Sequence, residues 1–273
     1  MIDLTINTDV ARTILTGFIR SEITRAGFHH AVVGLSGGVD SALSLALAVE
    51  ALGAENVLAV RMPYKSSSPD SLEHAALMIE QFEVPSETIE ITGMVDPLIG
   101  RDPEMSKVRK GNIMARARMI VLYDQSEVFQ GLVVGTSNKT EILLGYSTQW
   151  GDAASALNPI GDLYKTQVRQ LSRALNIPDV IIDKAPSADL WAGQTDESEL
   201  GFTYEQVDQL LYLLVDQRYL PEDCVEAGFD KNFVDKVIAR VRRNQFKRMQ
   251  PPIAKVSNRT IGYDFLYLRD WGT

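Results

Sequence analysis

The chain has 273 residues, of which 45% are hydrophobic and 23% charged, and its formal net charge at pH 7 is −9. This length and composition suit one α/β domain with a sizeable core, and we expect residues 1–273 to form a single domain. The negative charge argues against a nucleic-acid partner, and no apolar run approaches the length of a membrane span. The one cysteine, Cys224, excludes internal disulfides and cysteine-rich zinc sites.

The order of apolar patterns along the chain predicts alternating helices and strands. The first residues carry Asp3 and Asp9 and lack the apolar core of a signal sequence, so we expect a cytoplasmic protein. Helical spacing then predicts a helix over 9–26, with Thr8 as its N-cap. Strands are expected just before Gly34 and over 56–62, 88–91 and 131–136, and helices over 43–52, 70–82, 105–125, 163–175, 204–215, 221–227 and 232–249. This alternation predicts an α/β fold with a doubly wound parallel sheet flanked by helices.

Two adjacent glycines separate the first strand from the helix that follows it. Gly37 and Gly38 lack a Cβ, so the backbone can turn sharply and present N–H groups at the positive end of that helix. Ser36 and Ser41 add hydroxyl groups, and Asp40 supplies a carboxylate suited to a magnesium-bound polyphosphate. The stretch therefore predicts a pyrophosphate-binding loop with a magnesium ligand.

This loop also invites comparison with two other motifs. It is not a Walker A loop, because the chain contains no Gly-Lys pair. Gly34, Ser36 and Gly38 match the nucleophile elbow of hydrolases, but that mechanism needs a late histidine and none follows His74. A glycine-rich turn without a ligand is the remaining alternative, and it leaves the crowding of serine, glycine and aspartate unexplained.

A second polar turn follows the strand over 131–136, where Thr136 precedes a helix that carries Glu141 in its first turn. In an open parallel sheet, ligands bind at the carboxyl edge, beside the point where strand order reverses. If this strand pairs with the first, Glu141 lies close to Asp40 and the two carboxylates can hold one magnesium ion. The alternative is that Glu141 is only an acid favoured by the helix dipole.

Three further features suggest parts of the same site. Lys165 begins a helix, where the dipole disfavours a cation, so a bound phosphate explains it better than stability does. The polar loop over 64–69 is expected to cover the ATP site, and a plain surface connection is the alternative. The polar loop over 184–200 is expected to act as a lid, and disorder is the alternative. The irregular stretch 145–161 is long enough to suggest a function. Apolar residues flank Arg116 and Arg118 on their helix, so at least one of these guanidinium groups is expected near packed surface.

The glycine loop resembles the Ser-Gly-Gly-x-Asp-Ser loop of the N-type ATP pyrophosphatases. These enzymes adenylylate a substrate oxygen, release pyrophosphate and let a nitrogen or sulfur nucleophile displace AMP. Four further motifs narrow the resemblance to the ammonia-dependent NAD synthetases, in order from about residue 31 to residue 252. They are Gly135-Thr136-Ser137-Asn138-Lys139-Thr140-Glu141, Gly151-Asp152, Lys165-Thr166-Gln167 and Ala185-Pro186-Ser187-Ala188-Asp189-Leu190.

The resemblance implies an adenine nucleotide alpha hydrolase-like fold, ATP as co-substrate and Mg²⁺ as metal. It implies that Asp40 and Glu141 bind Mg²⁺, that Lys165 neutralises the departing phosphates and that Asp152 lies near the incoming ammonia. Asp40, Asp152 and Lys165 are thus the implied catalytic residues, and Arg116 is the implied contact of the dinucleotide. The implied ATP contacts are Gly34, Leu35, Ser36, Gly37, Gly38, Val39, Asp40, Ser41, Thr136, Lys165 and Ser187.

The implied reaction is attack of the deamido-NAD carboxylate on the α-phosphorus of ATP, followed by aminolysis of the acyl-adenylate by ammonia. The products are NAD, AMP and pyrophosphate, and the protein contributes positioning and charge stabilisation rather than covalent chemistry. The resemblance also implies a homodimer. Another N-type ATP pyrophosphatase with a different acceptor, and a non-catalytic nucleotide-binding module, are the alternatives.

Three positions depart from the pattern expected of this family. Gln149 stands where lysine is common, Ala156 where aspartate is common and Phe246 where histidine is common. All three belong to the dinucleotide side of the implied site, whereas the ATP side is intact. The ATP chemistry is therefore better supported by the sequence than the identity of the acceptor.

Overall fold

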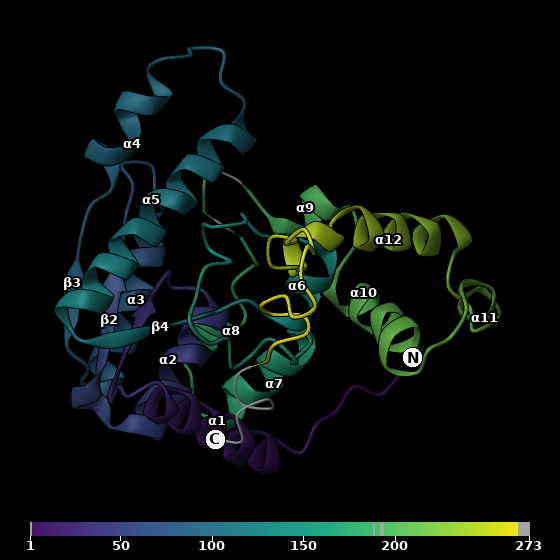
Figure 1. Cartoon of the computed structure of the whole chain (residues 1–273), viewed down its shortest axis with the longest axis horizontal. Coiled ribbons are helices and arrows are strands. Elements are labelled where there is room, and N and C mark those ends of the chain that lie inside the picture. Colours follow the sequence, from purple (N-terminus) through teal and green to yellow (C-terminus); the bar gives the residue numbers. More distant parts are fainter. Residues whose placement is uncertain (1, 188, 192–193, 267–273) are drawn as a thin grey trace.

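A four-stranded parallel sheet organises the fold of the computed structural model, which describes residues 2–187, 189–191 and 194–266. The strand order is β3-β2-β1-β4 (Figure 1), so β2 and β3 lie on one side of β1 and β4 lies on the other. This reversal beside β1 confirms the predicted doubly wound α/β fold. The strands are β1 (His30–Gly34), β2 (Val57–Arg61), β3 (Ser86–Thr88) and β4 (Gly131–Val134).

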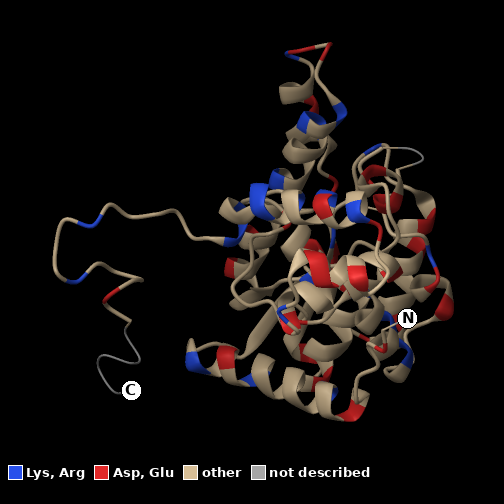
Figure 2. Cartoon of the chain, turned by 90° about the vertical axis from the view of Figure 1, so that its right-hand side faces the viewer, with Lys and Arg blue, Asp and Glu red and all other residues tan. Residues whose placement is uncertain are grey.

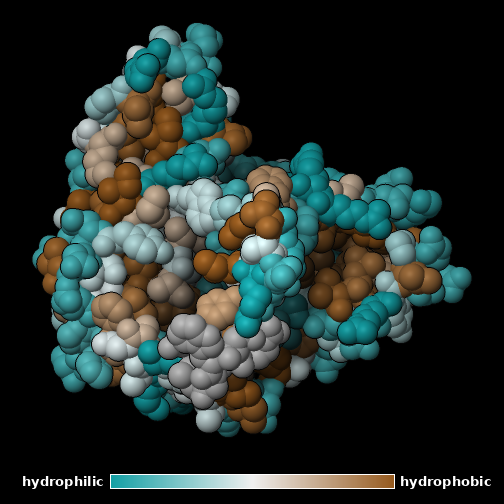
Figure 3. All heavy atoms as spheres, viewed as in Figure 1, coloured by the Kyte–Doolittle hydropathy of each residue, from teal (hydrophilic) through white to brown (hydrophobic). Residues whose placement is uncertain are grey.

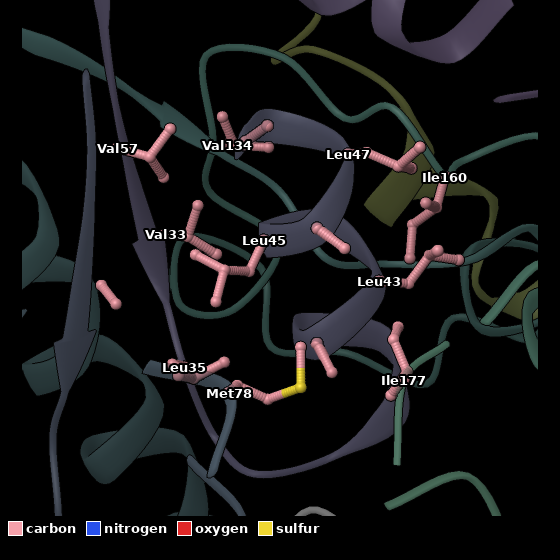
Figure 4. Close-up of a cluster of buried hydrophobic side chains, with 14 of the residues drawn as sticks. Val33, Leu35, Leu43, Leu45, Leu47, Val57, Met78, Val134, Ile160 and Ile177 are labelled. Carbon is pink, nitrogen blue, oxygen red and sulfur yellow. The ribbon is translucent and has the colours of Figure 1, made fainter. Parts of the chain in front are cut away.

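Successive residues of each inner strand face opposite hydrophobic layers. Val33 packs in one layer, whereas its neighbour Val32 packs in the other. Figure 4 shows the first layer, in which α2 lies between Val33 of the sheet and Ile160 and Ile177. The first layer includes α1 (Thr8–Arg25), α2 (Val39–Leu52), α3 (Pro69–Phe82), α7 (Lys165–Ala174) and α8 (Asp179–Ile182), and the second α4 (Thr92–Ile99) and α5 (Lys107–Val128).

A third hydrophobic cluster lies beside the sheet, at the right of Figure 1. It gathers the later helices around buried residues such as Leu144, Leu210 and Val237. Ile2 joins the start of the chain to it, because its N–H donates to Oε1 of Gln209 at 2.8 Å. The elements are α6 (Lys139–Leu144), α9 (Asp196–Leu200), α10 (Tyr204–Leu211), the π-helical turn Tyr212–Asp216, α11 (Pro221–Glu226), α12 (Lys231–Arg243) and the 3₁₀ turn Gln245–Arg248. After that turn, residues 249–266 run away from the body (Figure 2).

Most predicted elements are present, with differences at their ends. The N-cap of α1 is Asn7, whose side chain accepts from Val10 N–H at 3.0 Å, so the expectation of Thr8 is wrong by one residue. β3 spans residues 86–88 rather than the expected 88–91, and its exposed residues lack the apolar pattern from which a strand can be predicted. The expected loop over 184–200 ends in the short helix α9, which Thr195 caps. No helix within the described ranges is both long and apolar enough to cross a membrane.

The glycine loop depends on a backbone conformation that only glycine adopts without strain at Gly37. Its φ is +77°, and a Cβ there would lie 2.1 Å from the carbonyl oxygen of Ser71 on α3. We expect Gly37→Ala to lower the melting temperature, since the left-handed backbone alone costs about 1–2 kcal/mol and the contact with Ser71 adds to it. Gly38→Ala is the matched control, because its Cβ would meet nothing nearer than Ser36 Oγ at 3.5 Å. Equal melting temperatures of the two variants in calorimetry would contradict this explanation.

Candidate active site

The glycine loop lies at the carboxyl end of β1 and is held by its own serines. Ser41 Oγ accepts from Ser36 N–H at 3.2 Å and donates to the Gly38 carbonyl at 2.9 Å. Gly38 N–H in turn donates to Ser36 Oγ at 3.3 Å. Gly38 is also the N-cap of α2, so Asp40 falls in the first turn of that helix. The loop is thus preorganised, with its carboxylate at the positive end of a helix.

The end of β4 lies beside this loop, as the predicted pairing of the two strands requires. β1 and β4 are parallel neighbours, with Val33 opposite Val134. Asn138 then links the two ends: its side chain accepts from Glu141 N–H at 3.0 Å and donates to Asp40 Oδ1 at 2.8 Å. Asn138 is fully buried and was not predicted as a site residue. Its position three residues before a glutamate, the capping-box spacing, could have identified it as an N-cap.

Lys165 lies between the two predicted magnesium ligands. Its Nζ donates to Asp40 Oδ2, and it donates to Glu141 Oε1 at 3.3 Å. The lysine side chain is only 3% exposed, and its ammonium also lies 5.2 Å from the centre of the Tyr204 ring. Lys165, Asp40 and Glu141 therefore form one buried cluster.

The charges of this cluster shift one another's protonation. Burial lowers the pKa of Lys165, but the carboxylates of Asp40 and Glu141 outweigh burial and raise it above its usual range. Burial raises the pKa of Glu141, and the ammonium opposes this shift. A third acid, Asp196, is buried nearby, where it accepts from the hydroxyls of Tyr146 and Tyr204 at 3.1 Å each. Acids thus outnumber the lysine at this point.

The donors of the cluster fit a magnesium ion that also binds phosphate. Asp40 and Glu141 both reach one cationic atom, which is the arrangement that a shared metal ion needs. Within the described part of the chain, no three acids, histidines or cysteines form a complete metal-binding group. Magnesium commonly takes one or two carboxylates together with substrate phosphates and water. Asp40 and Glu141 would therefore hold the ion, and ATP oxygens would complete its coordination.

A cavity of about 540 Å³ opens beside the cluster and gathers most of the predicted residues. Gly37 does not line it, because that residue packs against Ser71. Arg116 does not line it either: its side chain is exposed, and Nη2 donates to the Gln149 carbonyl at 3.3 Å. The predicted residues that line the cavity are Gly34, Leu35, Ser36, Gly38, Val39, Asp40, Ser41, Thr136, Glu141, Asp152, Lys165 and Ser187.

Asp152 is held in the wall of this cavity at some distance along the chain from the glycine loop. Its carboxylate accepts from Thr148 N–H at 2.8 Å. Although the side chain faces the open cavity, the surrounding atoms raise its pKa by desolvation, and the hydrogen bond from Thr148 opposes that shift. Gln149, Ala156 and Phe246, the three departures from the family pattern, do not line the cavity.

Several cations that the sequence did not single out line the same cavity, among them Arg118 and Lys247. Arg118 Nε donates to the Met62 carbonyl at 3.0 Å, and Lys247 Nζ donates to the carbonyls of Gly145 and Ser147 at 2.7 and 2.6 Å. Burial lowers the pKa of both side chains. Arg118 lies on the basic helix α5 and Lys247 in the basic turn Gln245–Arg248. From the sequence alone, such runs of charge are expected on a solvent-exposed surface. Both are oriented by carbonyl groups, which leaves their charge available to an anionic ligand.

Two loops meet over the cavity. The carboxylate of Asp189 accepts from Ser68 N–H, with Oδ2 at 3.0 Å. Lys184 Nζ donates to Ser71 Oγ at 3.0 Å, and Leu190 fills the space beside Gly111 of α5. The predicted loops over 64–69 and 184–200 are therefore joined to each other and to α5. Part of the second loop, at 188 and 192–193, lies outside the described residues.

Comparisons with known proteins agree with this geometry. The sequence profile of the NAD synthase family matches residues 12–251. The NH(3)-dependent NAD(+) synthetase of Chlorobium phaeovibrioides is 58% identical over 269 residues, which cover 98% of this chain and 97% of that protein. Two solved structures superpose closely. NMN synthetase from Francisella tularensis has a TM-score of 0.80 at 30% identity and covers 93% of this chain and 100% of that one. The NH3-dependent NAD synthetase from Campylobacter jejuni has a TM-score of 0.79 at 33% identity and covers 92% and 100%.

The family profile covers most of the chain, the curated relative matches it nearly end to end, and both agree with the motifs around the buried cluster. The chain belongs to the NAD synthase family.

Proposed function

We propose that this protein amidates deamido-NAD with ammonia, at the expense of ATP, to give NAD, AMP and pyrophosphate. The observation that carries the proposal is the convergence of Asp40, Glu141 and Lys165 at the ends of β1 and β4, beside one cavity. ATP phosphates placed against the glycine loop would meet N–H groups, hydroxyls and an ammonium. Another N-type ATP pyrophosphatase with a different acceptor is the alternative.

The residues of the cluster have separate roles in the two half-reactions. Asp40 and Glu141 would hold Mg²⁺, and the bound ion would supply positive charge that stabilises the phosphates. Lys165 then stabilises the departing pyrophosphate, and the serines and N–H groups of the loop bind it. Asp152 lies in the cavity wall, where a carboxylate can hold ammonium near the acyl-adenylate and accept its proton. Thr136 and Ser187 contribute further ATP contacts.

The acceptor is the part of the reaction that family membership alone leaves open. A solved relative is an NMN synthetase, whereas the relative at 58% identity is an NAD synthetase. The higher identity favours the dinucleotide. Gln149 can still donate a hydrogen bond, and an exposed Phe246 can stack on a heterocycle. One hydrogen bond contributes about 0.5–1.5 kcal/mol, which a rearranged site can recover.

Ammonia is the proposed nitrogen source because the described residues offer no nucleophile for glutamine. Cys224 is fully buried, and burial together with Asp223 raises the pKa of its thiol. A thiol in that state is a poor nucleophile.

The lack of disulfide-forming cysteines agrees with a cytoplasmic location, which we also propose.

The position of Arg116 suggests where a second subunit binds. Its exposed side chain shares one face of α5 with Ile120 and Tyr123, which are 55% and 42% exposed. Further apolar side chains gather over α4 and the start of α5, at the upper left of Figure 3, where Leu98 and Val108 are 47% and 65% exposed. We propose a homodimer that covers this face, with the dinucleotide reaching from the cavity to Arg116 at the subunit boundary.

The reaction is tested by supplying the purified protein with ATP, Mg²⁺ and one acceptor at a time. With deamido-NAD and ammonium, we expect NAD and AMP to form in equal amounts. Glutamine in place of ammonium should lower kcat/KM by about tenfold or more, because the buried Cys224 is a poor nucleophile for releasing its nitrogen. Nicotinate mononucleotide in place of deamido-NAD should lower kcat/KM by about tenfold or more, because it leaves polar groups of a dinucleotide site unpaired. Equal turnover of the mononucleotide and of deamido-NAD would contradict the proposed acceptor. If AMP formed only with an unrelated carboxylic acid, the result would favour another N-type ATP pyrophosphatase with a different acceptor.

The assembly is tested by light scattering at micromolar concentration. We expect a molar mass of twice the chain's 30.3 kDa. Ile120→Glu should shift the protein toward monomer, since it places a charge in an apolar interface. Val180→Glu is the matched control, because Val180 is 53% exposed on α8, away from α5. A wild-type monomer, or equal dissociation of both variants, would argue against the proposed interface.

A further inference from the structure

Asp208 on α10 is a fully buried carboxylate that the proposed chemistry does not use. Its Oδ1 accepts from the hydroxyl of Thr140 at 2.5 Å, and its Oδ2 accepts from the backbone N–H of Thr166 at 2.8 Å. Thr140 is itself fully buried on α6, and Thr166 lies in the first turn of α7. One side chain on a third helix thus joins the N-terminal ends of two others.

The same hydrogen bonds continue to the residues of the cluster. Thr140 Oγ1 accepts from the backbone N–H of Lys165 at 3.0 Å, while its proton goes to Asp208. Thr140 is the immediate neighbour of Glu141, and Lys165 precedes Thr166. Asp208 therefore fixes the backbone next to the carboxylate of the proposed metal site and the backbone that carries its lysine.

The N-cap of α7 is Tyr164, whose own side chain makes no capping hydrogen bond, so other side chains accept from the first N–H groups of this helix. Gln167 Oε1 accepts from Tyr164 N–H at 3.0 Å, Thr140 accepts from Lys165 N–H, and Asp208 accepts from Thr166 N–H. The first N–H groups of a helix lack partners within it, and an anion there is favoured by the helix dipole. Asp208 supplies a hydrogen-bond acceptor and a negative charge from a distant part of the chain. Burial raises the pKa of its carboxyl, whereas the hydrogen bonds from Thr140 and Thr166 lower it.

Burying a carboxylate is costly unless its hydrogen bonds are made. A neutral N-cap residue in place of Tyr164 could satisfy α7 alone at lower cost, but it could not also bind Thr140. The arrangement is therefore best suited to fixing two helices relative to each other.

We propose that Asp208 is a positioning residue, which holds Lys165 and Glu141 at the separation that the bound ATP and Mg²⁺ require. This inference rests on the proposed function. Its effect should fall on the chemical step, because the two positioned side chains stabilise charge that develops on the phosphates. Binding of the dinucleotide should be little changed, since its proposed contacts lie elsewhere in the cavity and on α5.

The first test is Asp208→Asn, which keeps the size of the side chain and replaces one accepting oxygen with a donor. The one oxygen that remains can accept from either the Thr140 hydroxyl or the Thr166 N–H, and as a neutral acceptor it binds that group more weakly than the carboxylate does. We expect kcat to fall by at least about tenfold, with KM for deamido-NAD changed by less than about twofold. By NMR, the amide of Thr166 should exchange with solvent faster than in the wild type, which is a readout independent of turnover.

The matched control is Asp216→Asn. Asp216 lies in the same region and accepts from Tyr164 Oη and from Lys139 Nζ, the latter at 2.8 Å, so it contacts side chains of both helices but not the backbone of α7. This variant should keep its kcat and the slow exchange of Thr166. A general loosening of the region would lower kcat equally in both variants and would overturn the proposal.

A second pair of variants keeps the test decisive if Asp208→Asn does not fold. Thr140→Val removes the hydroxyl at nearly constant volume and should lower kcat as Asp208→Asn does, whereas Thr140→Ser keeps the hydroxyl and should restore it. Wild-type kcat in Thr140→Val or in a folded Asp208→Asn would overturn the positioning role. Absence of NAD formation by the wild type would instead refute the proposed function, so the two failures are distinguishable.

Discussion

The ammonium of Lys165, buried between Asp40 and Glu141, is the interaction on which the rest of the site depends. A buried charge is tolerated only where opposite charges and hydrogen bonds compensate its loss of water. Here the compensation comes from two helices that follow two different strands. The sheet must therefore place those strands side by side. The parallel pairing of β1 with β4 does this, and the reversal of strand order at that point leaves space for a ligand.

The surrounding residues keep this cluster in place by hydrogen bonds between segments that are distant along the chain. Asn138 holds Asp40 from the end of β4, and the tyrosines at 146 and 204 hold a third acid, Asp196, close by. Gly37 lets the loop approach the backbone of α3. The protein's own contacts thus hold the cluster in place, as expected of a site that acts by positioning and charge.

Much of this could be predicted from the sequence, because the relevant signals are local. Apolar runs identify the inner strands, and adjacent glycines with serine and aspartate identify the phosphate loop. The bounds of β3 were predicted wrongly because the strand is exposed and has no apolar pattern. The hydrogen bonds of Asn138 with Asp40 and of Asp208 with Thr140 could not be predicted, because the partners lie 98 and 68 residues away along the chain. Arg116 and Arg118 both lie among apolar neighbours, and the two-residue step turns them to different sides of α5. Only the fold distinguishes the exposed arginine from the one that lines the cavity.

The carboxylates of Asp40 and Glu141 are proposed to form one metal site together with the nucleotide phosphates. Electron paramagnetic resonance of Mn²⁺, added in place of Mg²⁺ with an ATP analogue that cannot be cleaved between the α- and β-phosphates, tests it most directly. We predict that the wild type binds one Mn²⁺ tightly only when the analogue is present. Glu141→Gln should weaken that binding by about tenfold or more, whereas Asp162→Asn, an exposed acid outside the cavity, should not. Equally tight Mn²⁺ binding by Glu141→Gln and the wild type, in the presence of the analogue, would contradict the account.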